Sequence, residues 1–339
     1  MSRSRLKDIA DKLGVSIATV SKVLNGSKEI SDETRKKVLR TAQLLNYSPN
    51  QTALNLRNRQ TKKLGVIIPT TAHYFFSEVM EGLIERAEKD GYLVIILPSN
   101  DKLALEKQQV NLLLEQQVDG ILISLSNTTD EFIHLKKIQS AGIPLVLFDK
   151  VEHSITCSKV RIDDFEAAYK AVSYLIKKGY KKIAHFRGKF NPKNASYRFE
   201  GYKQALKDHK LVFNPSLVYF CDSNRSYSGG YEAAKKALTD HHDLDAIFSS
   251  TDLAAIGVIK CFKELNIKVP EDVAVFGFSN WFMSSAVSPA LSTVHQPAYE
   301  MGVTAMEILI DEIKLQQKGQ PGIFKDIVLP TNLILRDSC

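Results

Sequence analysis

The stretch LKDIADKLGVSIATVSKVLNGSKEISDETRKKVLRTAQLLN (residues 6–46) contains three helical patterns separated by turn residues. Apolar residues recur at helical spacing in each pattern: Leu6, Ile9, Ala10 and Leu13, then Val20, Val23 and Leu24, then Val38, Leu39, Ala42 and Leu45. Gly14 interrupts the first helix, and Ser16 and Ser31 are suitable N-caps for the next two. Asn25-Gly26 and Asn46 are typical of helix ends. A helix, a tight turn and a second short helix predict a helix-turn-helix unit.

Positive charge is concentrated in the first fifth of the chain. Residues 1–63 hold 14 lysines and arginines against 5 acidic residues, a net charge of +9, whereas the other 276 residues hold 31 against 33. A small basic module on a near-neutral body indicates a polyanionic partner for that module alone. A solvated basic face would have the same composition, so the charge by itself leaves nucleic-acid binding open.

Seven continuous apolar runs follow, and helical stretches separate them. The runs are residues 64–69, 92–98, 119–124, 143–149, 181–186, 245–250 and 272–278. Continuous rather than alternating apolar strands, spaced by helices, predict parallel sheets that are buried on both faces. A Gly-Tyr pair precedes a strand at Gly91-Tyr92 and again at Gly179-Tyr180. This repeat indicates two similar α/β lobes, with a ligand cleft at the carboxyl ends of their strands.

The composition excludes several classes of protein. The chain has 339 residues, of which 44% are hydrophobic and 24% charged, enough for two or three folded domains. No apolar run approaches the ~20 residues of a membrane helix, and the N-terminus has no signal-peptide core, so we expect a cytoplasmic protein. Cys157, Cys221, Cys261 and Cys339 are far apart and have no CxxC spacing. They predict free thiols, and neither a metal nor a cofactor is expected.

The N-terminal pattern resembles the DNA-binding head of the lactose-repressor (LacI/GalR) family of bacterial transcription regulators. The resemblance is dense in VSIATVSKVLN (15–25), SDETRKKV (31–38) and LNYSPN (45–50), and weaker in LGVIIPT (64–70), STDLAAIG (250–257) and VPEDVAVFGFSN (269–280). It implies a helix-turn-helix DNA-binding head (1–47), a hinge helix and linker (48–63), and a two-lobed, periplasmic-binding-protein-like α/β core that dimerises (64–339). Lobe 1 is expected at about 64–160 plus 292–322, and lobe 2 at about 161–291 plus 323–339.

The resemblance also implies which head residues contact DNA. Ile17, Ala18 and Lys22 occupy the positions that read bases in the family. Ile17 and Ala18 offer apolar surface suited to thymine methyl groups, and Lys22 can donate to guanine N7 and O6. The alternative for Ile17 and Ala18 is packing against the first helix, and the alternative for Lys22 is a phosphate contact.

Other positions are expected to bind the DNA backbone or its minor groove. Phosphate contacts are expected for Arg5, Lys7, Ser16, Thr19, Ser21, Asn25 and Lys28. Leu56 matches the family's hinge leucine, which wedges between base pairs from the minor groove and kinks the duplex. Its alternative is packing onto the core. Asn50 and Ala53 are expected beside it.

In the core the resemblance implies six effector-contacting positions: Phe76, Asp149, Arg198, Thr251, Asp252 and Ser279. Each has a structural role as its alternative, and Asp252 more often orients a loop in the family. Ser279 stands where many sugar-binding members have Asp, and both Ser279 and Asn280 can donate hydrogen bonds to an anion. Together with Arg198, whose guanidinium pairs well with carboxylate or phosphate, they favour a sugar phosphate or sugar acid over a neutral sugar.

Further residues bear on that expectation in both directions. Arg187, Lys189 and Arg225 add cations in nearby segments, although their side chains could face solvent. Asp149 opposes an anionic effector, and it is an alternative partner for Arg198 in the empty cleft.

We therefore expect a DNA-binding transcriptional regulator, most often a repressor in this family. It would bind a near-palindromic operator as a homodimer under the control of a small-molecule effector, a sugar or sugar derivative. The alternative of a cytoplasmic solute-binding protein is disfavoured by the basic head. An enzyme is disfavoured because the chain has no GxSxG, Walker, HExxH or GxGxxG motif. His241-His242-Asp243 is interpreted as a solvated loop rather than a metal site.

Substitution of the hinge leucine tests the wedge. We expect Leu56→Ala to leave the protein folded and dimeric but to weaken operator binding sharply. An intercalating apolar side chain compensates for base unstacking, which costs a few kcal/mol per step. Fluorescence anisotropy on operator DNA measures the effect, and an unchanged affinity would exclude the wedge.

Overall fold

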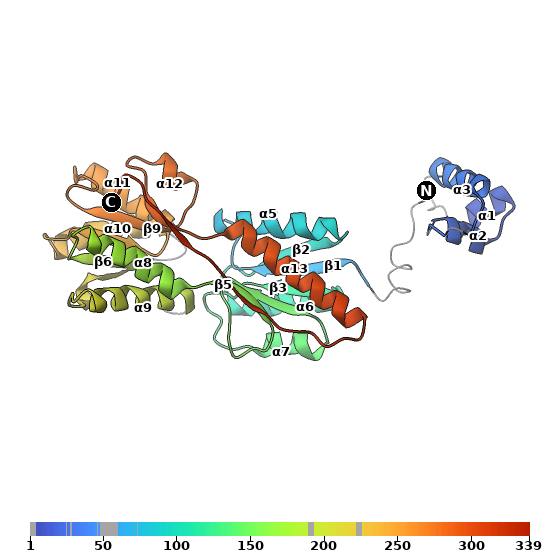
Figure 1. Ribbon diagram of the computed structural model, residues 1–339, viewed down its shortest axis with the longest axis horizontal. Coiled ribbons are helices and arrows are strands. Elements are labelled where there is room, and N and C mark those ends of the chain that lie inside the picture. Colours follow the sequence, from blue (N-terminus) through green and yellow to red (C-terminus); the bar gives the residue numbers. More distant parts are fainter. Residues whose placement is uncertain are drawn as a thin grey trace. The chain divides into compact units, whose positions relative to one another are not determined.

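The chain folds into two units, Met1–Thr61 and Lys62–Cys339, which are described separately (Figure 1). The computed structural model describes residues 5–24, 26–27, 29–45, 47, 60–72, 74–188, 193–221 and 226–339. Among them, no helix is both long enough and apolar enough to cross a membrane. All four cysteines are free thiols, as the sequence predicts.

The N-terminal unit is the predicted helix-turn-helix. Helices α1 (Leu6–Leu13), α2 (Ile17–Leu24) and α3 (Asp32–Leu44) pack around a small core that includes Ile9, Val20 and Val38. The Oγ of Ser16 accepts the amide of Thr19 at 3.0 Å, and the Oγ of Ser31 accepts the amide of Thr34 at 3.4 Å. Both predicted serine caps are therefore confirmed. Gly14 has φ +64, the left-handed conformation in which glycine ends a helix without strain.

The third helix differs from its predicted stripe at one position. Val38 is fully buried, and Ala42 also lies inward, but 45% of Leu39 is exposed. Leu39 is one residue, about 100° of helical rotation, beyond Val38. The inner face is already occupied by Val38, Thr41 and Ala42, so the Leu39 side chain lies at its edge.

The C-terminal unit contains two six-stranded sheets. The first has the order β11-β5-β4-β3-β1-β2, and all its pairings are parallel: β1 (Lys63–Ile68), β2 (Leu93–Pro98), β3 (Gly120–Ile123), β4 (Leu145–Phe148), β5 (Ser158–Ile162) and β11 (Asp326–Leu329). The second has the order β12-β10-β9-β8-β6-β7: β6 (Ile183–Arg187), β7 (Val218–Phe220), β8 (Ala246–Ser249), β9 (Ala274–Ser279), β10 (Ser292–His295) and β12 (Asn332–Ile334). Strand β12 is antiparallel to β10.

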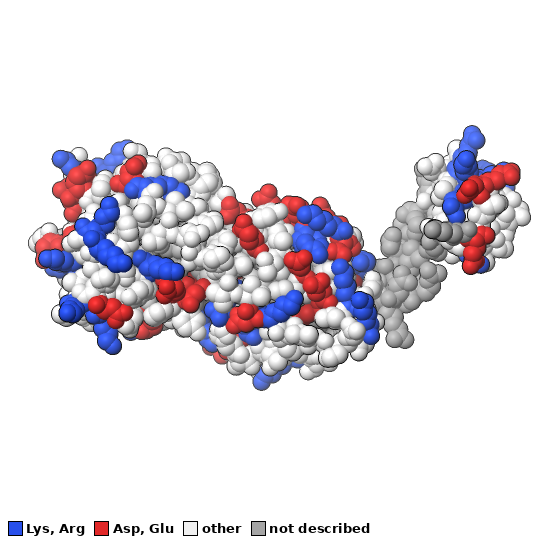
Figure 2. Space-filling model, viewed as in Figure 1, with Lys and Arg blue, Asp and Glu red and all other residues white. Residues whose placement is uncertain are grey.

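Helices cover both faces of the sheets, as expected for buried parallel strands (Figure 1). The first lobe has α5 (Tyr74–Lys89), α6 (Leu103–Glu115), α7 (Ile133–Ser140) and α13 (Ala298–Gln317). The second has α8 (Asp164–Lys177), α9 (Lys193–Asp208), α10 (Ser226–Asp240), α11 (Asp252–Glu264), α12 (Met283–Ala286) and the short 3-10 helix Pro215–Leu217. Figure 2 shows acidic and basic side chains interspersed on the visible face of this unit, in keeping with its near-neutral charge.

The chain crosses between the lobes three times, and the crossings correct the expected lobe boundaries. Strand β5 leads into α8, β10 leads into α13, and β11 leads into β12. Residues 292–295 therefore belong to the second lobe and β11 to the first, the reverse of the expectation. Strand β5 also carries the first lobe on to Ile162. The sequence did not reveal these assignments because β5, β10 and β11 are short, with only two, one and three apolar residues. Strand pairing rather than sequence pattern therefore decides which sheet each of them joins.

Helices α5 and α13 approach closely enough to require glycine. A Cβ at Gly302 would lie 2.1 Å from the carbonyl oxygen of Val79, and a Cβ at Gly82 would lie 2.2 Å from that of Tyr299. Both obstacles are backbone atoms, so neither can move without shifting a helix.

We therefore expect Gly302→Ala to destabilise the core by the roughly 1–3 kcal/mol typical of overpacking, despite the better helix propensity of alanine. Gly322→Ala is the control, because no atom lies within 4 Å of its added Cβ and its φ is not positive. Chemical denaturation of both variants measures the difference. Equal stabilities would contradict the close packing of the two helices.

Candidate functional site

The predicted base-reading residues lie on the outer face of α2. Ile17 is 47% exposed, and Ala18 and Lys22 are also exposed. The alternative that Ile17 and Ala18 pack against α1 is therefore not supported, because Val20 and Val23 fill that contact. Three apolar or cationic side chains on one exposed helical face suit entry into a major groove.

The remaining head residues divide into two groups. The Oγ atoms of Ser16 and Thr19 lie 2.9 Å apart at the start of α2, Ser21 is half-buried, and Arg5 and Lys7 are exposed. Asn25, Lys28, Asn50, Ala53 and Leu56 lie outside the described residues. One contact of the head was not predicted from the sequence: Lys22 Nζ lies 2.7 Å from Glu29 Oε2.

The core contains a cavity of about 160 Å³ between its two lobes. It is lined by Pro69, Thr70, Phe75, Phe76, Asp101, Asn127, Asp149, Lys150, Gly188, Asn194, Ala195, Arg198, Cys221, Ser250, Thr251, Ala254, Ser279 and Gln296. Five of the six expected effector positions are among them, and Asp252 is the exception. Most lining residues lie at or just after the ends of β1, β2, β3, β4, β6, β7, β8, β9 and β10, and the others belong to α5, α9 and α11. The cavity therefore lies where the carboxyl ends of parallel strands converge.

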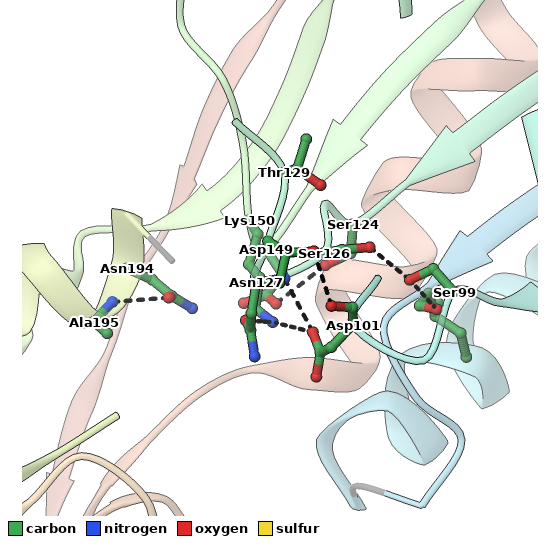
Figure 3. Close-up of polar contacts among 12 residues, drawn as sticks. Ser99, Asp101, Ser124, Ser126, Asn127, Thr129, Asp149, Lys150, Asn194 and Ala195 are labelled. Carbon is green, nitrogen blue, oxygen red and sulfur yellow. Dashed lines mark hydrogen bonds and ion pairs between the residues drawn. The ribbon is translucent and has the colours of Figure 1, made fainter. Parts of the chain in front are cut away.

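Four polar residues of the first lobe form one wall, and three of them, Asp101, Asn127 and Lys150, were not predicted. Lys150 Nζ donates to Asn127 Oδ1 and lies 3.5 Å from Asp101 Oδ1, which accepts the amide of Asn127 at 3.1 Å. Ser124 Oγ donates to Asp149 Oδ2 at 3.3 Å. Figure 3 shows this cluster, with Asn194 opposite it on the second lobe. Asp101 and Asp149 both have φ near +55, a conformation that Asp tolerates better than most residues.

A buried network supports this wall from behind. Glu106, which is fully buried, accepts the amide and the hydroxyl of Ser126 at 2.6 Å each through Oε2. Its Oε1 lies 2.8 Å from His134 Nε2, and Ser126 Oγ lies 2.8 Å from Ser99 Oγ. Burial alone would raise the pKa of Glu106, but the hydrogen bonds from His134 and Ser126 outweigh it and hold that pKa below its ordinary value. These contacts fix the loop that carries Asn127.

Arg198 dominates the opposite wall. Its Nε donates to Asp164 Oδ1 and its Nη1 to the carbonyl of Ser250, both at 2.7 Å. The guanidinium lies over the ring of Phe278, 3.7 Å from the centroid. Among the described residues, Nη2 is the one guanidinium nitrogen without a hydrogen bond, so it is available to a ligand. The partner of Arg198 is therefore Asp164, and the alternative pairing with Asp149 is wrong.

The other residues expected to favour an anion are occupied or distant. Ser279 Oγ donates to Gln296 Oε1 at 2.9 Å. Asn280 is not part of the lining, because its amide contacts His295 and Arg336. The guanidinium of Arg187 lies over the ring of Phe199, also outside the cavity, and Lys189 and Arg225 lie outside the described residues.

Asp252 orients a loop rather than facing the cavity. Its Oδ2 accepts the amide of Trp281 at 2.7 Å and the hydroxyl of Ser284 at 2.8 Å, and its Oδ1 accepts Thr293 Oγ1 at 2.5 Å. Both oxygens are thus used to hold the segment after β9. The Asp matched to the family motif has the loop-orienting role that was its alternative.

No group of three His, Cys, Asp or Glu side chains in the described part of the chain is arranged to hold a metal ion. His241, in the HHD sequence, instead contacts Ser216 through Nε2 at 3.0 Å.

Comparisons with known proteins agree with both units. Residues 5–50 match the family model "Bacterial regulatory proteins, lacI family", and residues 61–325 match "Periplasmic binding proteins and sugar binding domain of LacI family". Catabolite control protein A of Priestia megaterium is 36% identical over 89% of this chain and 90% of its own length. The ribose operon repressor of Haemophilus influenzae is 31% identical over 98% of both chains. A solved complex of the transcriptional regulator CelR with cellobiose superposes with a TM-score of 0.73 at 27% identity, covering 99% of this chain and 100% of the other.

The buried Asp164 predicts a pH dependence of stability. Burial raises the pKa of Asp164 from 3.8 to about 6, although Arg198 acts to lower it. Between about pH 6 and pH 4 the folded carboxyl therefore binds a proton that the unfolded one does not. Because the folded state holds this proton more tightly, protonation of Asp164 stabilises the folded protein by roughly 3 kcal/mol below pH 4. This stabilisation is lost as the pH rises through 6.

We expect the difference in unfolding free energy between the wild type and Asp164→Asn to change by this amount between pH 4 and pH 7. Urea denaturation across that range measures it. Parallel curves for the two proteins would contradict the raised pKa.

Proposed function

The chain belongs to the LacI family of bacterial regulatory proteins, and on that premise we propose that its head binds operator DNA while its core binds a neutral sugar. We propose further that it acts in the cytoplasm as a homodimeric transcriptional repressor. The observation that carries the proposal is the union, in one chain, of an exposed recognition face on α2 and a cavity between two lobes that is lined by both apolar and charged side chains.

The recognition face supports operator binding by its chemistry. Ile17 and Ala18 match the methyl group of thymine, and Lys22 carries donors for guanine. Serine caps hold α2 and α3 in place, so the face is preorganised. Two heads in a dimer would then read two half-sites of a near-palindrome.

The charges of the cavity favour an uncharged ligand, which revises the anionic effector expected from the sequence. Within the lining Lys150 pairs with Asp101, Arg198 pairs with Asp164, and the carboxyl group of Asp149 is present in addition. To pair with Lys150 or Arg198, an anionic ligand would have to displace the carboxylate that already pairs with that cation. A neutral sugar instead offers hydroxyl groups that donate to Asp149 and accept from Arg198 Nη2, and apolar C–H faces for Phe75 and Phe76.

Ligand binding can be coupled to DNA binding through lobe closure. The cavity lining comes from both lobes, and Gln296 lies in one of the crossings between them. A ligand that contacts both walls favours one closure angle over others. The entry of the chain into the core is fixed, because the amide of Lys62 donates to Asp119 Oδ2 at 2.8 Å and Lys62 Nζ lies 4.1 Å from the centroid of Tyr92. Motion of the first lobe therefore moves the segment that leads to the head.

Operator binding is tested on a duplex that the full-length protein enriches from a random-sequence pool. We expect near-palindromic sequences to emerge, and a fragment of residues 62–339 to bind them no better than scrambled DNA. Enrichment of no sequence by the full-length protein would exclude the proposed function.

The effector is tested by thermal shift with ribose, glucose, galactose and cellobiose and with their phosphorylated or oxidised counterparts. We expect a neutral sugar to stabilise the core, by about 2.7 kcal/mol at a hundredfold excess over Kd. Asn127→Ala, on the cavity wall, should weaken this stabilisation at least tenfold in ligand concentration. Asn111→Ala, whose side chain contacts Lys137 outside the cavity, is the control. Stabilisation by anionic sugars alone would contradict the charge argument.

A further inference from the structure

Lys22, which is predicted to read bases, already has a partner within the head. Lys22 lies in the last turn of α2, and its Nζ is 2.7 Å from Glu29 Oε2. Both side chains are largely exposed, 55% for Lys22 and 72% for Glu29. The hydrogen bond and charge of Lys22 hold the pKa of Glu29 below its usual range. Glu29 therefore remains ionised near pH 7, and the pair carries no net charge.

The backbone turn fixes the position of Glu29. The amide of Ser27 donates to the carbonyl of Lys22 at 3.0 Å, and Arg35 Nη2 on α3 donates to the carbonyl of Ser27 at 2.6 Å. On the other side of Glu29, Ile30 packs against the head core. The described residues around Glu29 are thus anchored to α2, to α3 and to the head core.

We propose that Glu29 is a specificity-determining residue that directs Lys22 to base edges and away from phosphates. The proposal rests on the proposed function, in which α2 enters the major groove. A lysine ammonium has three donors, so Lys22 can keep Glu29 and still donate to guanine O6 and N7. Those acceptors carry only partial negative charge, so Glu29 repels them less than it repels a phosphate. A phosphate carries a full negative charge. If Lys22 bound a phosphate while it kept Glu29, the phosphate and the Glu29 carboxylate would be brought close together and would repel each other.

This arrangement separates cognate from random DNA. Non-specific binding depends on neutralising phosphates and releasing their counterions, and a charge-neutral pair contributes little to that. Exposed ion pairs also contribute little to folding stability, so the pair is not needed to hold the head together. Glu29 then acts as the repulsive element that specificity requires in addition to attractive contacts.

The test compares Glu29→Gln with Glu33→Gln in the full-length protein. Glu33 pairs with Lys37 at 2.8 Å on α3, with similar exposure, so its substitution makes the same charge change away from Lys22. The probes are the duplex enriched by the wild type and a scrambled duplex of equal length, with anisotropy recorded from 50 to 200 mM salt.

We expect Glu29→Gln to tighten binding to the scrambled duplex by about 3- to 10-fold and to steepen its salt slope by about 1 per head. Binding to the enriched duplex should change less than 2-fold, so the specificity ratio falls. Equal effects of Glu29→Gln and Glu33→Gln would overturn the proposal, because net charge alone would then explain them.

A double-mutant cycle with Lys22→Gln shows whether the effect of Glu29 on specificity depends on Lys22. In the Lys22→Gln background, Glu29→Gln should no longer change the specificity ratio. A ratio that still falls would also overturn the proposal, because Glu29 would then act without Lys22. Thermal unfolding of each variant checks that the head stays folded. If the wild type enriches no duplex, the proposed function itself fails; if it does and Glu29→Gln has no effect, only this inference fails.

Discussion

Parallel strand pairing is the constraint on which the core depends. Parallel neighbours must be joined by crossover connections, so each strand enters its sheet from the same edge and leaves at the opposite one. In both lobes the carboxyl ends therefore meet at a single edge, and the loops that follow them bring Asp101, Asn127 and Asp149 together from distant parts of the sequence. The same geometry in the second lobe places Thr251 and Ser279 against them. The cavity is a consequence of this arrangement.

The polar walls of that cavity are held by contacts that a ligand does not need to supply. Glu106 anchors the loop of Asn127, and Asp164 with Ser250 anchors Arg198. Because Asp164 pairs with Arg198 and Asp101 pairs with Lys150, an uncharged ligand can enter without breaking an ion pair. Ion pairs and hydrogen bonds within the protein offset the free-energy cost of burying these charged groups. The ligand can then be recognised through hydrogen bonds to its hydroxyl groups and through contacts with the phenylalanine rings.

The head is stabilised differently from the core unit, because it has too few residues to form a large hydrophobic core. Ile9, Val20 and Val38 fill its interior, and the hydroxyl groups of Ser16 and Ser31 cap the first turns of α2 and α3. The outer face of α2 is therefore not needed for packing within the head. Ile17 and Ala18 can then be apolar without being buried, and Lys22, the charged residue of α2, contacts Glu29 rather than the head core.

The local sequence pattern was sufficient to predict many of the helices and strands of this protein. Helical periodicity and serine caps predicted α1, α2 and α3, and continuous apolar runs predicted seven strands of two parallel sheets, because both signals arise within a few residues of chain. The family pattern also indicated Phe76, Asp149, Arg198, Thr251 and Ser279 at the cavity. Asp101, Asn127 and Lys150 follow the apolar runs as polar residues, a signal that strand-end geometry could have used.

Tertiary structure alone decided the rest. Which sheet takes β5, β10 and β11 depends on pairing between residues more than 100 positions apart in some cases, such as Arg161 with Val328. The partner of Arg198 was likewise undecided by sequence, since Asp149 and Asp164 have the same side chain and only their distance distinguishes them. The same holds for Lys22 and Glu29, seven residues apart across a turn. A sequence pattern specifies which groups are available, whereas charge pairing depends on separations of a few ångströms that exist only after the chain has folded.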